Sequence, residues 1–163
     1  MTVPSLPRVG IGLDVHALAD GRRLVLGGVE IPHTSGLAGH SDGDALIHAI
    51  IDALLGAANR GDIGQWFPSS DQRWAGADSL EMLRTVVTAL TAEGWQLGNV
   101  DATIIAQQPR IGPHVALMRE RLSAALGLPE DAVSIKATTT DHLGALGRAE
   151  GIAAQAIALL VRI

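Results

Sequence analysis

Asp14 and His16, in the segment RVGIGLDVHAL, are the residues of this sequence best suited to do chemistry together. They are two positions apart in a stretch that predicts a strand, so both side chains leave the same face of it. A second segment, GHSDGDALIHAIIDALLGAA, adds His48 from a predicted helix. One carboxylate and two imidazoles form a three-ligand set for a divalent metal. A fourth position stays open to water or substrate, which is typical of a catalytic site.

Each of these residues also has an ordinary interpretation. A D-x-H triplet alone is a weak motif, and His48 is equally compatible with a core histidine on the apolar face of its helix. The spacing therefore leaves a metal site and a structural role as open alternatives. The other segments of the chain have to separate them.

The composition limits the class of protein. At 163 residues, the chain is expected to form one domain over residues 1–163, with residues 1–7 as a flexible N-terminus. The absence of cysteine excludes disulfides and thiolate ligands. There is no pattern of a secretory signal or a membrane span, so we expect a cytoplasmic protein without a membrane partner. A net charge of −5 and only 12 Lys and Arg residues argue against a nucleic-acid partner.

The elements that must position these residues alternate between strands and helices. Apolar spacing and turn signals predict, in chain order, a strand at 8–17, a hairpin at 23–31, a helix ending at 58, a helix from 78 or 79 to 93, a strand at 99–107, a helix at 113–126 and a strand at 132–137. Ser41 is expected to cap the first helix, with Asp44 three residues on as a short capping box. Residues 151–163 fit both a helix and a buried strand, and periodicity does not decide between them.

Six segments occur in an order and spacing that point to one family: DVHAL, GHSDGDALIHAIIDALLGAA, GDIGQWFP, GNVDATIIAQ, KATTTD and GRAEGIA. Together they resemble 2-C-methyl-D-erythritol 2,4-cyclodiphosphate synthase, an enzyme of the non-mevalonate isoprenoid pathway. The resemblance implies an α/β subunit (α+β, with a ferredoxin-like type of layer) that assembles as a homotrimer. Each subunit is expected to have one four-stranded mixed sheet toward the trimer centre and helices on its outer face. The resemblance also favours a strand for residues 151–163.

The resemblance implies a lyase reaction. The 2-phosphate of 4-diphosphocytidyl-2-C-methyl-D-erythritol 2-phosphate attacks the β-phosphorus of its own diphosphate, CMP leaves, and 2-C-methyl-D-erythritol 2,4-cyclodiphosphate forms. The two phosphate groups repel one another, and an acidic chain with few basic residues has little positive charge to offset this. Divalent metals are expected to supply it. The nucleophile is already an anion, so it needs orientation more than a strong base.

Asp14, His16 and His48 resemble the family's tetrahedral metal ligands, most often for Zn²⁺. A second cation, Mg²⁺ or Mn²⁺, is expected on the diphosphate, where the family uses a glutamate after the threonine run. This chain has Asp141 there, one methylene shorter, and an intervening water is compatible with that change. The structural alternative for Asp141 is that it caps a turn.

The resemblance also assigns the substrate contacts. His40 and Thr139 are expected to be catalytic, by stabilising the transition state, and Ser41 and Thr138 to contact phosphate. The other substrate-binding residues that it implies are Asp62, Ile63, Gly64, Phe67 and Asp71 around the erythritol, Ala106, Pro109, Arg110, Ile111 and Gly112 in a cytidine pocket contributed by the neighbouring subunit, and Arg148 near the trimer axis.

Two other functions fit parts of the pattern. An Asp-His-His set with an open position also suits a zinc phosphohydrolase that activates water. The lack of further Asp and His ligands for a second metal and the separate nucleotide-pocket segment disfavour it. A trimeric binding protein that keeps the pocket without catalysis is the other alternative. The product formed from the substrate separates all three.

Overall fold

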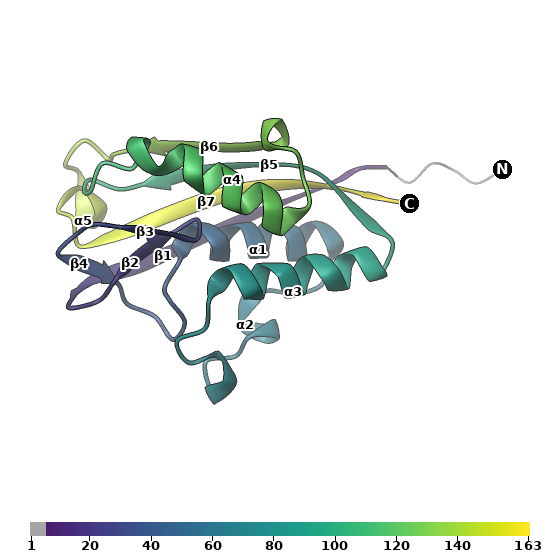
Figure 1. The fold of residues 1–163 in the computed structure, drawn as a ribbon, viewed down its shortest axis with the longest axis horizontal. Helices are drawn as coiled ribbons and strands as arrows, with labels where there is room; N and C mark the ends of the chain where they lie inside the picture. Colours follow the sequence, from purple (N-terminus) through teal and green to yellow (C-terminus); the bar gives the residue numbers. More distant parts are fainter. Residues whose placement is uncertain (1–5) are drawn as a thin grey trace.

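A mixed sheet runs along the molecule and carries helices on one side (Figure 1). The computed structural model describes residues 6–163, so residues 1–5 of the predicted flexible terminus lie outside it. The strands, in their order across the sheet, are β4 (Ser35–Leu37), β1 (Arg8–Asp20), β7 (Gly151–Arg162), β5 (Trp95–Ile105) and β6 (Val133–Thr138). Only β5 and β6 are parallel, while the other neighbours are antiparallel. The α+β class with a mixed sheet is confirmed.

The prediction of four strands was wrong, because the sheet has five. The additional strand, β4, has the sequence Ser-Gly-Leu, which is too short and too poor in β-branched residues to give a strand signal. It pairs with the end of β1, with Leu37 opposite Leu18 and Ser35 opposite Asp20. β1 therefore extends three residues beyond its predicted end at residue 17.

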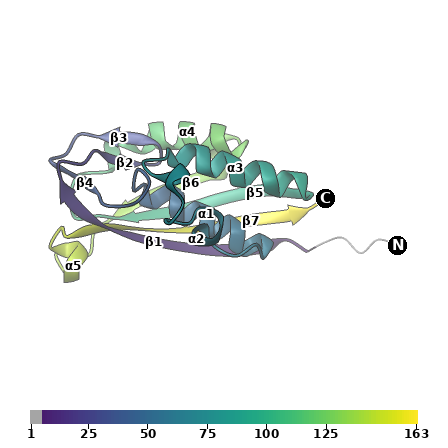
Figure 2. The same cartoon turned by 90° about the horizontal axis from the view of Figure 1, so that it is seen from below.

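Helices α1 (Ala45–Ala58), α3 (Ser79–Ala92) and α4 (Val115–Leu126) pack on one face of the sheet. Figure 2 shows α3 and α4 together on the same side of the strands. Two short helices, α2 (Ile63–Trp66) and α5 (Gly144–Gly147), lie in the connections. The predicted hairpin is present as β2 (Leu24–Leu26) and β3 (Val29–Ile31), a separate two-stranded sheet. None of the helices in residues 6–163 is long and apolar enough to cross a membrane.

The C-terminal segment is a strand, as the family resemblance favoured. β7 lies between β1 and β5 and is antiparallel to both. Its alanines, including Ala154, Ala156 and Ala158, are buried. Alanine has little β-propensity, so the place of this segment between two long strands determines its conformation.

The central helix α1 lies unusually close to β1 because two glycines face it. A Cβ atom on Gly10 would lie 1.9 Å from the carbonyl oxygen of Ala53, and one on Gly12 would lie 1.9 Å from that of Ala49. Real Cβ atoms cannot approach an oxygen so closely. Glycine at these positions allows the helix backbone to rest on the strand, which brings the side chains of both elements within reach of one another.

The start of α1 differs from the prediction. The helix begins at Ala45, and its N-cap is Asp44 rather than Ser41. The Asp44 carboxylate accepts hydrogen bonds from the backbone N–H groups of Ile47, Gly27 and Gly28, at 2.8–3.0 Å. Burial raises the pKa of Asp44 to about 6, with a further contribution from the charge of Asp42 and opposition from the three N–H donors. A single carboxyl group thus joins the β2–β3 hairpin to the start of α1.

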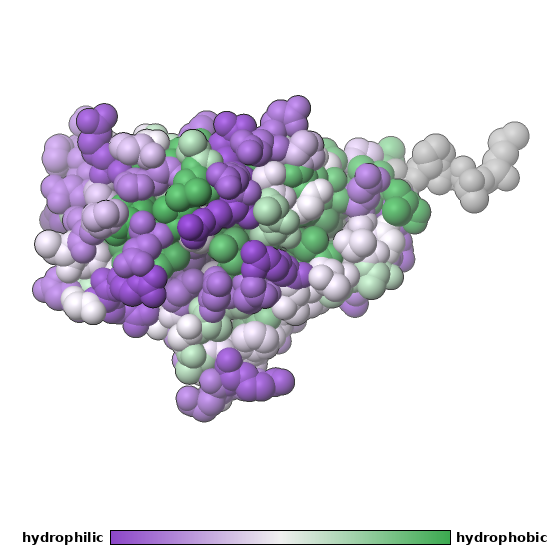
Figure 3. Space-filling model, viewed as in Figure 1, coloured by the Kyte–Doolittle hydropathy of each residue, from purple (hydrophilic) through white to green (hydrophobic). Residues whose placement is uncertain are grey.

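The two sides of the sheet differ in character. The helix-bearing side displays hydrophilic residues mixed with smaller apolar patches (Figure 3). On β1, the side chains that alternate with Gly10 and Gly12 point away from α1. They are apolar and exposed: Val9 by 64%, Ile11 by 61%, Leu13 by 62% and Val15 by 56%. Exposed apolar residues in such a continuous row indicate an interaction surface.

Candidate metal and substrate site

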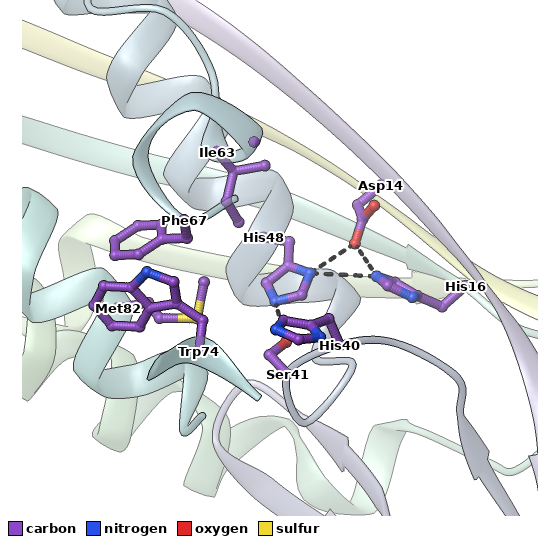
Figure 4. A pocket seen from close by; sticks show the side chains of 10 residues that line it. Asp14, His16, His40, Ser41, His48, Ile63, Phe67, Trp74 and Met82 are labelled. Atoms are coloured by element: carbon purple, nitrogen blue, oxygen red, sulfur yellow. Dashed lines mark hydrogen bonds and ion pairs between the residues drawn. The ribbon is translucent and has the colours of Figure 1, made fainter. Parts of the chain in front are cut away.

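Asp14, His16 and His48 come together at the contact between β1 and α1 (Figure 4). Asp14 Oδ2 lies 2.7 Å from His16 Nε2 and 3.1 Å from His48 Nδ1. The two ring nitrogens are 3.3 Å apart. One ligand atom from each residue therefore falls within 4.8 Å of the others. The sequence-based prediction of this cluster agrees with its geometry.

Backbone geometry explains the cluster. Asp14 and His16 alternate with outward-facing residues along β1 and so leave the face that meets α1. His48 lies on the first turn of α1, one residue before Ala49, whose carbonyl rests on Gly12. The close approach of helix and strand thus brings the imidazole of His48 to the pair on β1.

Each imidazole is held from behind by a second hydrogen bond. His16 Nδ1 lies 2.5 Å from the carbonyl oxygen of Ala38, and a carbonyl only accepts, so Nδ1 carries a proton and Nε2 faces the cluster. His48 Nε2 lies 3.1 Å from Ser41 Oγ and 3.0 Å from Ser79 Oγ. Such outer contacts orient metal-binding histidines.

The charges of the cluster favour an ionised carboxylate. Burial on its own would raise the pKa of Asp14, but hydrogen bonds and charges from His16 and His48 outweigh it and lower that pKa to about 2. The hydrogen bond with Asp14 raises the pKa of His16 above its ordinary value, although partial burial opposes this. A compact set of one carboxylate oxygen and two imidazole nitrogens fits a tetrahedral Zn²⁺ with one open position.

The cluster lies at one side of a cavity of about 220 Å³. This cavity, called the metal-type cavity below, is lined by the three candidate metal ligands of the cluster. Its lining also includes five residues that were predicted for the substrate site: His40, Ser41, Ile63, Gly64 and Phe67. Asp71 is not in this lining. It contacts the site indirectly, because its carbonyl oxygen lies 3.1 Å from His40 Nε2.

Two residues of the cavity wall, Trp74 and Met82, were missed by sequence reasoning. With Phe67 they form the apolar side of the pocket, opposite Asp14 and His16 (Figure 4). The rings of Phe67 and Trp74 meet edge to face with their centroids 4.7 Å apart. The only available signal for Trp74 was its type, because aromatic residues are 2% of the chain.

Asp62 caps the short helix α2, where its carboxylate accepts hydrogen bonds from the backbone and the side chain of Gln65 at 2.9 and 3.1 Å. The same helix is tied to α1, because the backbone N–H of Ile63 donates to Asp52 at 2.7 Å. The exposed Asp62 carboxylate therefore lies beside the cavity, on a segment that is hydrogen-bonded to α1, the helix that carries His48.

The predicted cytidine-pocket residues, together with Thr138 and Thr139, gather at the ends of β5 and β6, around a second cavity of about 190 Å³. Its lining comprises Ala106, Gln107, Pro109, Arg110, Ile111, Gly112, Ala137, Thr138 and Thr139. Among the described residues of one protomer, Thr138 and Thr139 therefore do not line the cavity that contains Asp14. Asp141 is exposed and has a positive φ of 53°, just after the threonine run.

The comparisons with known proteins agree with this geometry. The family model described as YgbB matches residues 7–161. A protein from Dechloromonas aromatica (strain RCB), named 2-C-methyl-D-erythritol 2,4-cyclodiphosphate synthase, is 58% identical over 96% of this chain and 98% of its own. This chain belongs to the 2-C-methyl-D-erythritol 2,4-cyclodiphosphate synthase family.

Solved structures of synthases from this family have the same fold. A 2C-methyl-D-erythritol-2,4-cyclodiphosphate synthase with bound CDP matches with a TM-score of 0.86 and 38% identity, over 94% of this chain and 99% of its own. A CDP complex of IspF from Plasmodium falciparum matches with a TM-score of 0.84 and 33% identity, over 96% of both chains. Two synthase structures that overlay along their full length thus hold a cytidine nucleotide.

Arg148, which was predicted near the trimer axis, lines neither cavity. It forms an exposed ion pair with Glu150, with 2.7 Å between Nε and Oε1, just before β7 begins. Surface ion pairs of this kind contribute little stability.

Proposed function

We propose that this chain catalyses the conversion of 4-diphosphocytidyl-2-C-methyl-D-erythritol 2-phosphate to 2-C-methyl-D-erythritol 2,4-cyclodiphosphate and CMP. The observation that carries the proposal is the Asp14–His16–His48 cluster on one wall of a cavity, in a chain 58% identical to a named synthase. In the reaction, an oxygen of the 2-phosphate forms a bond to the β-phosphorus, and the bond from that phosphorus to the oxygen of CMP breaks.

Asp14, His16 and His48 would hold a Zn²⁺, which supplies positive charge and orientation to the phosphate when bound. This assignment fits the donor set, because three ligand atoms lie within 4.8 Å and the carboxylate is ionised. Asp141 would help to hold a Mg²⁺ or Mn²⁺ at the diphosphate, through a water that compensates for its short side chain.

The chain's own groups orient the substrate. Ser41 reaches the cavity beside the cluster, and its hydroxyl can donate to a phosphate oxygen. His40, which lines the same cavity, would stabilise charge on the phosphate that reacts. Asp62, Ile63 and Gly64 would bind the erythritol hydroxyls, and Phe67 and Asp71 belong to the segment that closes the site. Holding both phosphates in line is the main catalytic contribution that such reactions need.

The cavity around Arg110 and Gly112 would bind the cytidine. Support comes from the CDP bound in two relatives of the same fold. Thr138 and Thr139, at the rim of this cavity, would then contact the diphosphate and stabilise the transition state. Because this cavity and the metal-type cavity have no lining residue in common, we propose that one active site combines the first cavity of one protomer with the second cavity of its neighbour.

A homotrimer would join the cavities in this way. The exposed apolar row on β1 supports the proposal, since burying such a surface between copies is favourable at about 25 cal/mol for each Å² removed from water. Arg148 and its partner Glu150 would lie toward the axis of the assembly.

Phosphorus NMR of the purified protein with the diphosphocytidyl substrate and Mg²⁺ tests the reaction. We expect CMP and a pair of coupled cyclic-diphosphate resonances, both abolished by a chelator and by His48→Gln. His33→Gln is the matched control, because His33 lines neither of the two proposed cavities. Inorganic phosphate or a linear product would instead indicate a phosphohydrolase, and an unchanged spectrum would indicate a binding protein.

A further inference from the structure

The hydroxyl of Ser79 lies behind His48 and has its own proton committed elsewhere. Ser79 is the first residue of α3 and is fully buried. Its Oγ lies 2.5 Å from Asp42 Oδ1 and 3.0 Å from His48 Nε2. A serine hydroxyl has one proton to donate, while an ionised carboxylate only accepts. The Ser79 proton therefore goes to Asp42, and the oxygen of Ser79 is left to accept.

We propose that Asp42 and Ser79 are positioning residues that keep the proton of His48 on Nε2 and leave Nδ1 free to bind a cation. If Ser79 Oγ accepts, then His48 Nε2 must donate. Nδ1 is then unprotonated, and it is the atom that faces Asp14 Oδ2 at 3.1 Å. The inference rests on the metal site of the proposed function, and it assigns a role in that site to two residues that were not among the predicted site residues.

Asp42 is itself held in place, so the direction of this chain of bonds is fixed. Its Oδ2 accepts from the backbone N–H of Ser79 at 3.0 Å, and its Oδ1 accepts from that of Asp44 at 3.1 Å. All three groups around the carboxylate are donors. The loop before α1 and the start of α3 are joined further, because the N–H of Asp42 donates to the carbonyl of Ala77. These hydrogen bonds join the N-terminal ends of α1 and α3 and hold the Ser79 oxygen against His48.

Ser41 is the competing partner of His48, and its surroundings differ. Ser41 Oγ lies 3.1 Å from Nε2, but no carboxylate takes its proton in the described chain. Ser41 also lines the cavity, whereas Ser79 does not. The two serines therefore have different roles. Ser79 orients the imidazole, and Ser41 keeps a proton that it can donate to the substrate.

The arrangement predicts an unsatisfied pair of acceptors at the cluster. With its proton on Nε2, His48 turns a lone pair on Nδ1 toward Oδ2 of Asp14 and donates no hydrogen bond to it, so that His16 is the remaining imidazole that keeps this carboxylate ionised. His16 already donates from Nδ1 to Ala38, so it supplies a proton to Asp14 from Nε2 only when its ring is doubly protonated. A cation between the three atoms replaces that proton and satisfies all three acceptors at once. Contacts of this outer kind typically change metal affinity by about 10–100-fold when they are removed.

NMR of ¹⁵N-labelled imidazoles tests the proposal in the metal-free protein, together with zinc affinity measured by competition with a chelator. We expect the neutral His48 ring to carry its proton on Nε2 in the wild type. Ser79→Ala should move it toward Nδ1 and weaken zinc binding by about 10–100-fold. Ser41→Ala should leave the proton on Nε2. Ser123→Ala, which removes a buried serine of α4 bonded to the Leu128 carbonyl, should change neither measurement.

A second variant covers the case in which Ser79→Ala does not fold. Asp42→Asn keeps the size of the side chain and removes its charge, so we expect a smaller loss of zinc affinity and a partial move of the proton. Once Ser79 is alanine, the Asp42 change should have no further effect, because Asp42 acts through Ser79.

The proposal is overturned if the wild-type proton resides on Nδ1, or if only Ser41→Ala moves it. It is also overturned if the two substitutions weaken zinc binding independently. Failure of the proposed function looks different. A wild type that binds no zinc, but whose His48 proton still moves on Ser79→Ala, would keep the positioning role and reject the metal site.

Discussion

Gly12 lies so close to Ala49 that no side chain fits between them: a Cβ atom on the glycine would be 1.9 Å from the alanine's carbonyl oxygen. Gly12→Ala should therefore push α1 away from β1 and destabilise the fold by about 1–3 kcal/mol, as overpacking does. His48 moves with the helix, so zinc affinity should fall as well. Urea unfolding and a chelator competition measure the two effects.

Gly56→Ala is the control for this substitution. Gly56 is an exposed glycine of α1, and a Cβ there meets only a backbone oxygen of Ile11 at 3.9 Å. Alanine should stabilise the helix by about 0.5–1 kcal/mol. Equal effects of the two substitutions would contradict the importance of the close helix–strand contact.

The raised pKa of Asp44 predicts how the free energy of unfolding depends on pH. Its pKa is about 6 in the folded chain, above the ordinary value of 3.8. The folded state therefore binds this proton more tightly, so the stabilisation is present below pH 3.8 and is lost as the pH rises to 6. The loss is about 3 kcal/mol, at 1.36 kcal/mol for each pH unit. Unfolding measured from pH 4 to 7 should show this decline relative to Asp44→Asn, and parallel curves would contradict it.

The raised pKa of His16 leads us to expect that metal binding releases protons. The hydrogen bond with Asp14 raises the pKa of His16, so this imidazole holds its second proton more tightly than a free histidine does. Zinc must displace this proton, and zinc affinity should therefore weaken as the pH falls through the raised pKa. Calorimetry in buffers of different ionisation enthalpy measures the released protons. His16→Gln should bind zinc more weakly and release fewer of them, and an unchanged release would exclude His16 as the source.

The apolar row on β1 predicts the assembly. Native mass spectrometry should give three times the chain mass of 16.9 kDa. Leu13→Glu places a charge at the centre of the row, where Leu13 is 62% exposed, and should give monomers without synthase activity. Leu117→Glu is the matched control, because Leu117 is an exposed leucine on α4. If Leu13→Glu stays trimeric, another surface makes the assembly.

The sequence predicted the cluster of Asp14, His16 and His48 through the family resemblance, because strand alternation places only Asp14 and His16 together and His48 lies 32 positions from His16. It could not identify Ser79, since that residue lies 31 positions from His48 and only the packing of α3 brings them together. Ser41 was assigned the cap that Asp44 provides. Both residue types cap helices well, and the difference lies in the N–H groups of Gly27 and Gly28, which attract the Asp44 carboxylate.

The strands also differ in how strongly their own sequence predicts them. β5 is rich in β-branched residues and was predicted from its own composition, although it begins four residues earlier than expected. β4 has no such local signal, and the composition of β7 fits a helix as well as a strand. Their conformations follow from pairing with β1, which a local pattern does not encode.

The separation of the two cavities within one chain has a genetic consequence. A protein altered at His48 and another altered at Thr139 would each be inactive alone. In a mixed assembly, however, the intact metal-type cavity of the second chain can meet the intact threonine rim of the first. Co-expression of the two defective alleles should therefore restore growth to a cell that depends on this gene, whereas two alleles that damage the same cavity should not complement one another.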